Sequence, residues 1–294
     1  MPLQYLVEYF NDRLGREHQS SVRPFILEAG KVSGLFGPVR VDSVLKPLRN
    51  VFTPSIIVGH AAQMNVATNT APHLYVNEIK PLVTNNNSVE EAESIINFDR
   101  LSRTVHMLNY LTIVHLEGVL FLDVDPRHIL GVKQDHGAYF EEVIRQCGLE
   151  TNNVAIVLTL NSQYAPYYED LERGLENYRR RGYQIALKFD YIVRNVQTFS
   201  LIEKIAPQYV IQSARNLIGR VHSDELFEQL SQFNAKIASL GAQSILEHIE
   251  EKKFDALARN SGFDLVDGDY YNEESLNQFE DSNLNQYAVS GSHY

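Results

Sequence analysis

The sequence predicts an α/β fold in which parallel strands alternate with helices, and it favours a closed barrel. Three observations support this prediction. Short apolar runs typical of strands alternate with segments of helical periodicity, glycines follow several of the helical segments, and the pattern recurs about every 30 residues. Repeated strand–helix units over most of a chain of 294 residues suit a TIM-like barrel. An open doubly wound sheet is the alternative that the pattern leaves open.

The first third of the chain predicts a hairpin, an irregular stretch and a long helix. Residues 22–27 and 31–39 have the pattern of two strands around a turn at 28–30. The stretch from about 55 to 87 contains Asn-rich segments, and we expect an elaborated loop there. Ser88 followed by Glu91 matches a capping box, which predicts the start of a helix that runs to about Tyr110.

The remaining elements alternate along the chain. Apolar runs predict strands at 119–123, 154–160, 184–187, 209–211 and 242–246. Helical spacing predicts four helices that end near Gly148, Gly182, Gly241 and Gly262. The helix that ends at Gly241 also has a clear start, because Ser223 is a capping residue and two acids follow it.

Composition excludes several classes of protein. The chain is 44% hydrophobic and 21% charged, as expected of a globular domain with a core. It has no apolar run of about 20 residues for a membrane span, and its start lacks the features of a signal peptide. A single cysteine, Cys147, excludes an internal disulfide and a cysteine-rich metal site. We therefore expect a cytoplasmic protein without a membrane partner, and the net charge of −11 argues against a nucleic-acid partner.

The acidic charge is concentrated at the C-terminal end. Residues 264–294 hold seven acids and no Lys or Arg, and the sequence after Tyr271 is rich in polar side chains. We predict a disordered acidic tail over 272–294, although a docking peptide is an alternative. Its candidate anchors would be Phe279, Leu284, Tyr287 and Val289. The predicted regions are thus a helical extension over 1–20, a barrel over 21–271 and the tail.

Five segments, taken in order, resemble the motifs of one family. The family is the EAL domain, a bacterial cyclic-di-GMP phosphodiesterase barrel named for a Glu-Ala-Leu motif. Residues 98–111 resemble the first long helix of one EAL subgroup, and 121–128 resemble the end of its "LNVSP" strand. The other matches are 182–187 before Asp-Asp-Phe-Gly, 246–250 for Ala-Glu-Gly-Val-Glu, and 262–268 for the Gly-x-Asp-x-x-Gln-Gly ending. The resemblance covers about residues 20–271 and implies a TIM-like barrel of the EAL type.

The resemblance also implies a site for two divalent metals, such as Mg²⁺ or Mn²⁺, that clamp the attacking and leaving oxygens. The family's metal positions fall on Phe36, Asp123, Thr159, Lys188 and Phe189. The two phenylalanines offer no oxygen, and Lys188 puts a cation where a metal would lie. The family's catalytic Lys falls on Ile211 and the Asp that follows it falls on Ser213. We therefore expect neither catalytic residues nor a metal cofactor, and Mg²⁺ or Mn²⁺ only if the enzyme alternative below holds.

Four residues remain as candidates for ligand binding, namely Arg40, Asp123, Glu247 and Asp267. Arg40 matches a family arginine that contacts ligand phosphate, but a structural ion pair is an equal alternative. We expect Asp123 to pair with Lys188 rather than bind a metal, because an unpaired buried charge is costly. Glu247 matches the first Glu of its motif and could join that network, and Asp267 stands where the family has the late Gln.

Two further groups have structural interpretations. We expect His106 and His115 to be core or helix-face residues rather than ligands. The run 179–181 consists of three arginines at the end of a helix, where cations are favoured by the helix dipole. No Gly-x-Gly-x-x-Gly or P-loop pattern supports a nucleotide site of those types.

The sequence therefore predicts a catalytically inactive EAL-like domain. We expect a regulatory binding module in bacterial cyclic-di-GMP-related signalling that acts through an unidentified regulatory protein, and a homodimer is left open. One alternative is a cyclic-di-GMP receptor without hydrolysis. Another is an active phosphodiesterase whose metals are held by other residues. A barrel repurposed for different chemistry lacks a nucleophile–base pair in the sequence.

Overall fold

The computed structural model describes residues 2–17, 23–68, 88–113, 118–132, 137–219 and 223–271. Its strands are β1 (Phe25–Glu28), β2 (Lys31–Phe36), β3 (Val39–Asn50), β4 (Ile57–Thr68), β5 (Val119–Val124), β6 (Val154–Leu160), β7 (Gln184–Phe189), β8 (Tyr209–Ser213), β9 (Gln243–Glu247) and β10 (Leu265–Val266). Its α-helices are α1 (Leu3–Glu17), α3 (Ser88–Tyr110), α4 (Pro126–Gly131), α5 (Ala138–Gln146), α6 (Tyr168–Arg180), α7 (Val196–Ile205), α8 (Asp224–Ser239) and α9 (Lys252–Ser261). Short 3-10 helices lie at Thr151–Asn153, Ser162–Tyr167, Ala214–Leu217 and Asp269–Tyr271.

The strands follow the order β1-β2-β3-β10-β9-β8-β7-β6-β5-β4, and β3 also pairs with β4. This is the strand order of a closed barrel. The pairs β4–β5, β5–β6, β8–β9 and β9–β10 are parallel, whereas β3 is antiparallel to β2 and β10. The predicted TIM-like barrel is therefore confirmed, with a mixed rather than an all-parallel sheet.

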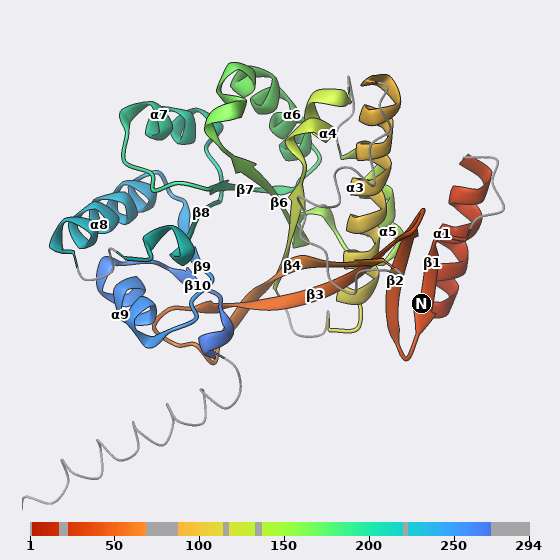
Figure 1. Ribbon diagram of the computed structural model, residues 1–294, viewed down its shortest axis with the longest axis horizontal. Helices are drawn as coiled ribbons and strands as arrows, with labels where there is room; N and C mark the ends of the chain where they lie inside the picture. Colours follow the sequence, from red (N-terminus) through yellow and green to blue (C-terminus); the bar gives the residue numbers. More distant parts are fainter. Residues whose placement is uncertain are drawn as a thin grey trace, which may run out of the picture. The chain divides into compact units, whose positions relative to one another are not determined.

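The chain divides into two units, which are described separately (Figure 1). Unit 1 consists of Met1–Lys46 and Gly59–Lys188, and unit 2 consists of Pro47–Val58 and Phe189–Tyr294. Within the residues described, no helix combines the length and the apolar character that a membrane crossing requires.

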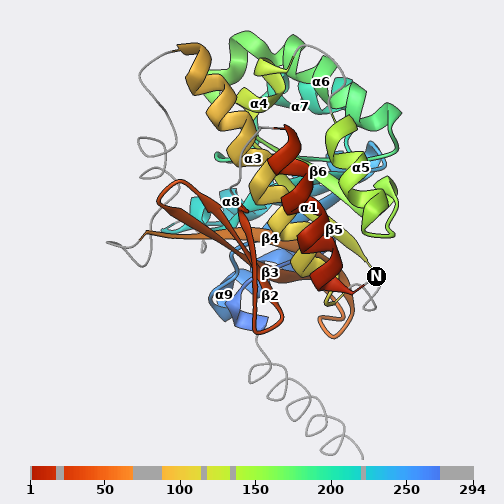
Figure 2. The same cartoon turned by 90° about the vertical axis from the view of Figure 1, so that its right-hand side faces the viewer.

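In unit 1, α3 packs on the antiparallel strands that begin the sheet (Figure 2). The close approach depends on Gly34, because a Cβ atom there would lie 2.5 Å from Cδ2 of Leu101 and 2.8 Å from Cγ2 of Val105. The amide of Asn109 then pairs with the backbone of Val32, accepting from its N–H at 3.0 Å and donating to its carbonyl at 2.7 Å. These contacts fix the register between α3 and β2.

The predicted N-terminal helix is α1, and it is docked on unit 1. The Asn11 amide donates to the carbonyl of Phe25 at 2.8 Å and accepts from the N–H of Phe25 at 2.9 Å. The ring of Tyr139 lies 4.5 Å from the guanidinium of Arg13 and 4.7 Å from that of Arg100. Because α1 satisfies the free backbone groups at the start of β1, it protects part of an edge strand.

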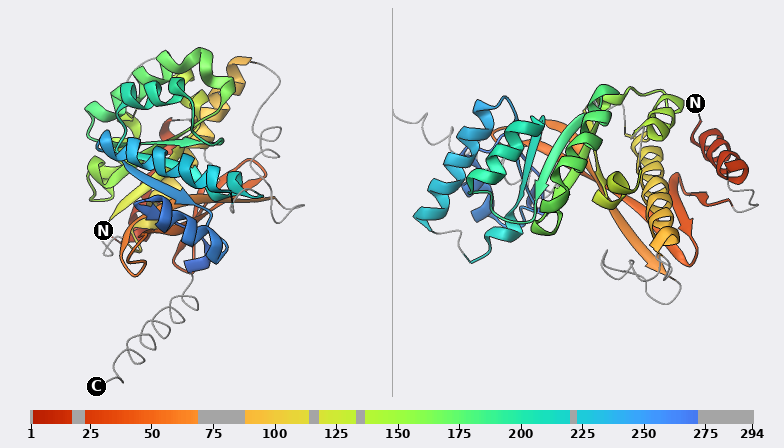
Figure 3. Two further views of the ribbon diagram at one scale, coloured as in Figure 1. Left: turned by 90° about the vertical axis from the view of Figure 1, so that its left-hand side faces the viewer. Right: turned by 90° about the horizontal axis from the view of Figure 1, so that it is seen from above.

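Unit 2 carries parallel strands β8, β9 and β10 with α7, α8 and α9 around them (Figure 3). Aromatic side chains pack beside these helices: the Phe233 ring of α8 lies 6.3 Å from that of Phe199 in α7 and 6.1 Å from that of Phe263, which follows α9. The predicted start of α8 is confirmed, since the Ser223 hydroxyl accepts from the N–H of Leu226.

One part of the predicted architecture is wrong. Residues 57–68 form β4, although the sequence predicted a loop from about 55 to 87; residues 69–87 lie outside the described part. The strand β3 and the helices α4 and α7 were not predicted either. By contrast, β6 spans 154–160 as predicted, and α3 begins at Ser88 and ends at Tyr110. The predicted tail over 272–294 also lies outside the described residues.

Candidate functional site

In unit 1, the end of β5 carries the first candidate residue. Asp123 is the penultimate residue of that strand and is exposed, while Lys188 near the end of β7 and Thr159 in β6 are half-buried. An exposed carboxylate keeps its hydration, so the cost of an unpaired buried charge does not apply to Asp123. A pair between Asp123 and Lys188 stays a prediction.

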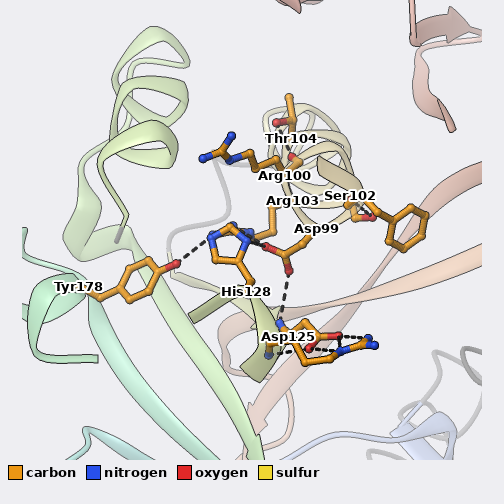
Figure 4. Close-up of polar contacts among 10 residues, drawn as sticks. Asp99, Arg100, Ser102, Arg103, Thr104, Asp125, His128 and Tyr178 are labelled. Carbon is orange, nitrogen blue, oxygen red and sulfur yellow. Dashed lines mark hydrogen bonds and ion pairs between the residues drawn. The ribbon is translucent and has the colours of Figure 1, made fainter. Parts of the chain in front are cut away.

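A buried network of charged side chains contacts the backbone just after the end of β5 (Figure 4). Asp99 and Arg103, one turn apart on α3, approach to 2.5 Å, and Nδ1 of His128 lies 3.0 Å from the Asp99 carboxylate. Nη1 of Arg103 reaches the Tyr178 hydroxyl at 3.4 Å, and the N–H of Asp125 donates to Asp99 at 3.3 Å. The network thus joins α3, α4 and α6 and anchors the backbone two residues beyond Asp123.

The network holds its ionisable groups in defined states. Burial alone would raise the pKa of the Asp99 carboxyl, but the charge of Arg103 and the hydrogen bonds of His128 and Asp125 bring it below its ordinary value. Burial lowers the pKa of His128, although Asp99 opposes this. Burial alone would lower the pKa of Arg103, but attraction to Asp99 together with the contributions of Tyr178 and Tyr183 raises it above its ordinary value. Arg103 and His128 both lie within 3.0 Å of the Asp99 carboxylate, which indicates a structural role.

The structure places Phe36 and Arg40 on the antiparallel strands, away from the parallel ones. Phe36 ends β2, and its ring packs on that of Phe98 at 5.4 Å. Ligands in α/β barrels come from the carboxyl ends of parallel strands, and Phe36 does not lie at one, so its match to a family metal position stays untested. In the motif order, Glu-Ala-Leu precedes the "LNVSP"-like strand β5, and the strand parallel to β5 is β4, with Ala61 opposite Phe121. Residues 57–68 contain no Asp or Glu.

Arg40 has its partners within the same antiparallel strands. Its guanidinium lies 3.3 Å from both Asp42 and Glu28 and donates to the Ser33 hydroxyl at 2.8 Å. Hydrogen bonding to Asp42 raises the pKa of Arg40 above its ordinary value. This is the ion-pair arrangement that the sequence offered as the alternative to ligand binding; the ligand role itself is untested.

In unit 2, four polar residues gather at the carboxyl ends of β8, β9 and β10. Ser213 pairs in register with Glu247, and both are buried. Nδ1 of His248 lies 3.1 Å from the Ser213 hydroxyl and 3.1 Å from the Glu247 carboxylate. The N–H of His248 donates to the Asp267 carboxylate at 2.8 Å. Thus the structure brings together Glu247 and Asp267, and it adds His248, which the sequence analysis missed.

The backbone at His248 is unusual. Its φ of 61° is in the left-handed region, which favours glycine, and the family motif has Gly at this position. The conformation is held from two sides, since Asp267 accepts from the N–H of His248 through its carboxylate and from the N–H of Ile249 through its carbonyl at 2.9 Å. The signal that could have identified His248 was its replacement of that motif glycine.

The cluster is not a nucleophilic triad. In a Ser–His–acid triad the serine and the acid contact opposite nitrogens of the imidazole, whereas Ser213 and Glu247 both contact Nδ1 of His248. The neighbouring family positions are apolar: the Phe189 ring is fully buried against Tyr191, and Ile211 is buried. Among the residues that the structure describes, no group of three or more His, Cys, Asp or Glu side chains is arranged to hold a metal ion.

The remaining candidates have structural environments. His106 is buried as predicted; its Nδ1 lies 2.7 Å from the Ser43 hydroxyl, and burial lowers its pKa to about 4. His115 lies outside the described residues. The three arginines at the end of α6 pair with acids, as expected of a helix end: Arg179 and Arg180 with Glu176, and Arg181 with Glu141. Burial raises the pKa of the Cys147 thiol to about 12, so it is not a reactive cysteine.

Comparison with solved structures identifies the fold. The EAL domain of Xanthomonas citri FimX in complex with cyclic-di-GMP aligns with a TM-score of 0.62 at 12% identity, over 91% of this chain and 92% of that one. Klebsiella pneumoniae BlrP1, in a calcium and cyclic-di-GMP complex, aligns with a TM-score of 0.63 at 13% identity. That match covers 78% of this chain and 54% of BlrP1.

A third structure agrees with these two. The Bacillus subtilis YkuI protein, which has an EAL domain and was solved with cyclic-di-GMP and calcium, aligns with a TM-score of 0.60 at 18% identity. The match covers 85% of this chain and 62% of YkuI. No family model matches the sequence, and no curated protein matches it.

The strand order and the parallel pairs define a TIM-like α/β barrel. Within that class, the chain has the fold of EAL domains. At sequence identities of 12–18%, the structural alignments establish the shared fold alone. The chemistry has to be argued from the chain's own residues.

Proposed function

We propose that this chain is a non-hydrolysing EAL-like domain that acts as a regulatory module in cyclic-di-GMP-related signalling, through interaction with a partner protein in the bacterial cytoplasm. The proposal rests on the chemistry of its own residues, while the link to cyclic-di-GMP rests on the solved EAL structures that contain this nucleotide.

The observation that carries the proposal is the contact of Glu247 and Asp267 with His248. Glu247 lies 3.1 Å from Nδ1 of His248, and Asp267 accepts from its N–H at 2.8 Å. A carboxylate that binds a metal needs its oxygens free to face the ion. Here Asp267 accepts a hydrogen bond from His248 and Glu247 lies beside the same residue, while Phe189 and Ile211 are buried apolar side chains.

Regulation through a protein partner is favoured over nucleotide sensing by the environment of Arg40. A receptor would use this arginine for ligand phosphate, yet its guanidinium is already paired with Asp42, Glu28 and Ser33. Releasing it would break these contacts.

One calorimetric series tests the proposal. The full chain is titrated with cyclic-di-GMP alone, with Mg²⁺ and with Mn²⁺, and each mixture is then analysed for the linear dinucleotide. We expect neither hydrolysis nor metal-dependent binding. Turnover with either metal at a rate of about 1 s⁻¹ or above contradicts the proposal. Binding without hydrolysis would instead favour the receptor.

A further inference from the structure

Among the four histidines that the structure describes, His248 alone has a side chain that reaches solvent. His60, His106 and His128 are buried, whereas the side chain of His248 is 14% exposed. His248 follows directly after β9, at the carboxyl end of a parallel strand, where α/β barrels carry their functional residues. The proposed function uses the contacts that hold His248 and not its imidazole.

The backbone of His248 points to a functional role. Its φ of 61° is in the left-handed region, and the family motif has glycine at this position. Residues other than glycine that are held in this region cluster at active sites and ligand sites. The chain therefore keeps an imidazole where its own backbone favours a residue without a side chain.

One nitrogen of the imidazole is fixed and the other is open. Nδ1 of His248 lies 3.1 Å from the Ser213 hydroxyl and 3.1 Å from the Glu247 carboxylate. An ionised carboxylate can only accept hydrogen bonds, so Glu247 favours a proton on Nδ1, and Nε2 of the neutral ring then keeps a lone pair. Within the described residues, Nε2 makes no hydrogen bond and is not one of the fully buried polar atoms.

This arrangement suits a nucleophile that attacks phosphorus. As Nε2 forms a bond, positive charge develops on the ring, and the Glu247 carboxylate beside Nδ1 stabilises that charge. Arg215 can neutralise the phosphoryl oxygens. Its N–H donates to the Ser213 hydroxyl at 3.4 Å, and its guanidinium, which is 59% exposed, lies 3.1 Å from the carboxylate of Glu250.

We propose that Nε2 of His248 is a phosphorylation site whose donor is an acyl phosphate. The Nε2 lone pair forms the P–N bond, the P–O bond to the acyl oxygen breaks, and the carboxylate leaves with that electron pair, while Nδ1 keeps its proton. A nucleoside triphosphate is disfavoured as the donor, because the sequence has neither a Gly-x-Gly-x-x-Gly nor a P-loop pattern.

The modification would regulate the module. A phosphoryl group adds negative charge and three acceptor oxygens, here at the carboxyl ends of β8, β9 and β10. The charge lies close to Glu247 and draws Arg215 away from Glu250, so this face would contact a partner protein differently in the two forms. This consequence rests on the proposed function, whereas the phosphorylation itself rests on the geometry of His248.

The first experiment incubates the purified full chain with acetyl phosphate, a small acyl phosphate. Mass spectrometry under alkaline conditions locates the product, because phosphohistidine is lost in acid. We expect one phosphoryl group on His248. The control is His248→Gly, which keeps the other nine of the ten histidines and suits the left-handed backbone, so it folds without the imidazole. Equal phosphorylation of the parent chain and this variant overturns the proposal.

A second arm distinguishes a small donor from one carried by a protein. The full chain is isolated from its source cells under alkaline conditions and analysed in the same way. Phosphate on His248 in both arms means that a small acyl phosphate suffices, and phosphate in the cell-derived chain alone means that another protein holds the acyl phosphate. Both results support the site. No phosphate on His248 in either arm overturns it.

The rate of phosphorylation tests the part played by Glu247. We expect Glu247→Gln to slow the reaction at least about 10-fold, because an amide cannot stabilise the charge on the ring. The matched control is Glu251→Gln, which removes an exposed acid from the same connection and should change the rate less than about 2-fold. Thermal melting confirms that both variants fold.

An unchanged rate in Glu247→Gln overturns the proposed activation of His248. None of these outcomes involves cyclic-di-GMP. Hydrolysis of cyclic-di-GMP would overturn the proposed function instead, so the two failures are distinguishable.

Discussion

Nδ1 of His128 lies 3.0 Å from the Asp99 carboxylate, and Nε2 of the same ring lies 3.4 Å from Nη2 of Arg103. An arginine can only donate, so Nε2 accepts and Nδ1 donates. The imidazole is therefore neutral and in one tautomer. Protonation of His128 would make Nε2 a donor that faces the donating guanidinium of Arg103. This unfavourable contact would lie inside the network that anchors the end of β5.

This arrangement predicts that the folded state loses stability in acid. Burial lowers the pKa of His106 to about 4 and also lowers that of His128. Below about pH 6.5 these histidines bind protons in the unfolded chain, whereas in the folded chain they stay neutral. The free energy of unfolding therefore falls as the pH falls. For His106 alone, the free energy of unfolding should drop by about 1.5 kcal/mol between pH 6.5 and 5, because the slope rises from half of about 1.4 kcal/mol per pH unit at pH 6.5 to nearly its full value at pH 5.

Urea titrations at several pH values measure this loss. The variant His106→Gln has no imidazole to protonate and should show a flatter dependence on pH over the same range. If the variant and the parent chain have the same slope, His106 is not the residue responsible.

The pair of Asp99 and Arg103 predicts a strong effect of removing one partner. We expect Arg103→Met to lower the free energy of unfolding by about 3–5 kcal/mol, because it leaves the buried Asp99 charge without compensation. The double variant with Asp99→Asn should be more stable than Arg103→Met alone, since the uncompensated charge is then gone. Denaturant unfolding of the single and double variants tests both statements.

A matched control uses an exposed pair in the same unit. Arg145 lies 2.6 Å from Glu141, also one turn apart, but its side chain is 74% exposed. We expect Arg145→Met to cost less than about 1 kcal/mol. Similar losses in the two arginine variants would mean that burial does not decide the energy of these pairs.

The fold could be predicted from sequence where one signal dominated. The apolar run of β6 and the capped start of α8 needed no tertiary information. The strand β4 was missed because Gly59, His60 and Ala61 have weak strand propensity, and pairing with β5 determines their conformation. Tertiary context of this kind is invisible in a single sequence.

The site was predictable in its residues but not in its contacts. Motif positions selected Glu247 and Asp267, and the structure brings them together. The spacing of Asp99 and Arg103 is that of an i,i+4 pair, but no pattern connects either residue to His128. The left-handed backbone of His248 is likewise a property of the fold and not of its neighbours in sequence.

That backbone predicts the order of stability of two small substitutions. At φ 61° an alanine carries a steric cost of about 1 kcal/mol or more that a glycine does not. Both His248→Gly and His248→Ala remove the contacts with Ser213 and Glu247, so the comparison isolates the backbone. We expect His248→Gly to be the more stable variant by about 1 kcal/mol in urea unfolding. The opposite order would show that His248 is not left-handed in solution.

The last prediction concerns Gly268, which allows the chain after Asp267 to approach the segment after His248. A Cβ atom at Gly268 would lie 2.0 Å from the carbonyl oxygen of Ile249 and 2.4 Å from its nitrogen. These are backbone atoms, so they cannot rotate away as a side chain would. The φ of Gly268 is 150°, which adds conformational cost for any other residue. We expect Gly268→Ala to destabilise unit 2 by more than about 3 kcal/mol.

The control for Gly268→Ala is Gly241→Ala, in the turn after α8. Gly241 also has positive φ, at 73°, but a Cβ atom there would have no other atom within 4 Å. The substitution Gly241→Ala should therefore lower the free energy of unfolding only by the backbone penalty of about 1 kcal/mol. Unfolding by urea gives the two losses, and their difference measures the steric contact with Ile249. Because that contact holds Asp267 against the N–H of His248, Gly268→Ala should also change the amide resonance of His248, whereas Gly241→Ala should leave it unchanged. Equal losses in the two variants, with an unaltered His248 resonance, would mean that the close approach at Gly268 does not support the cluster.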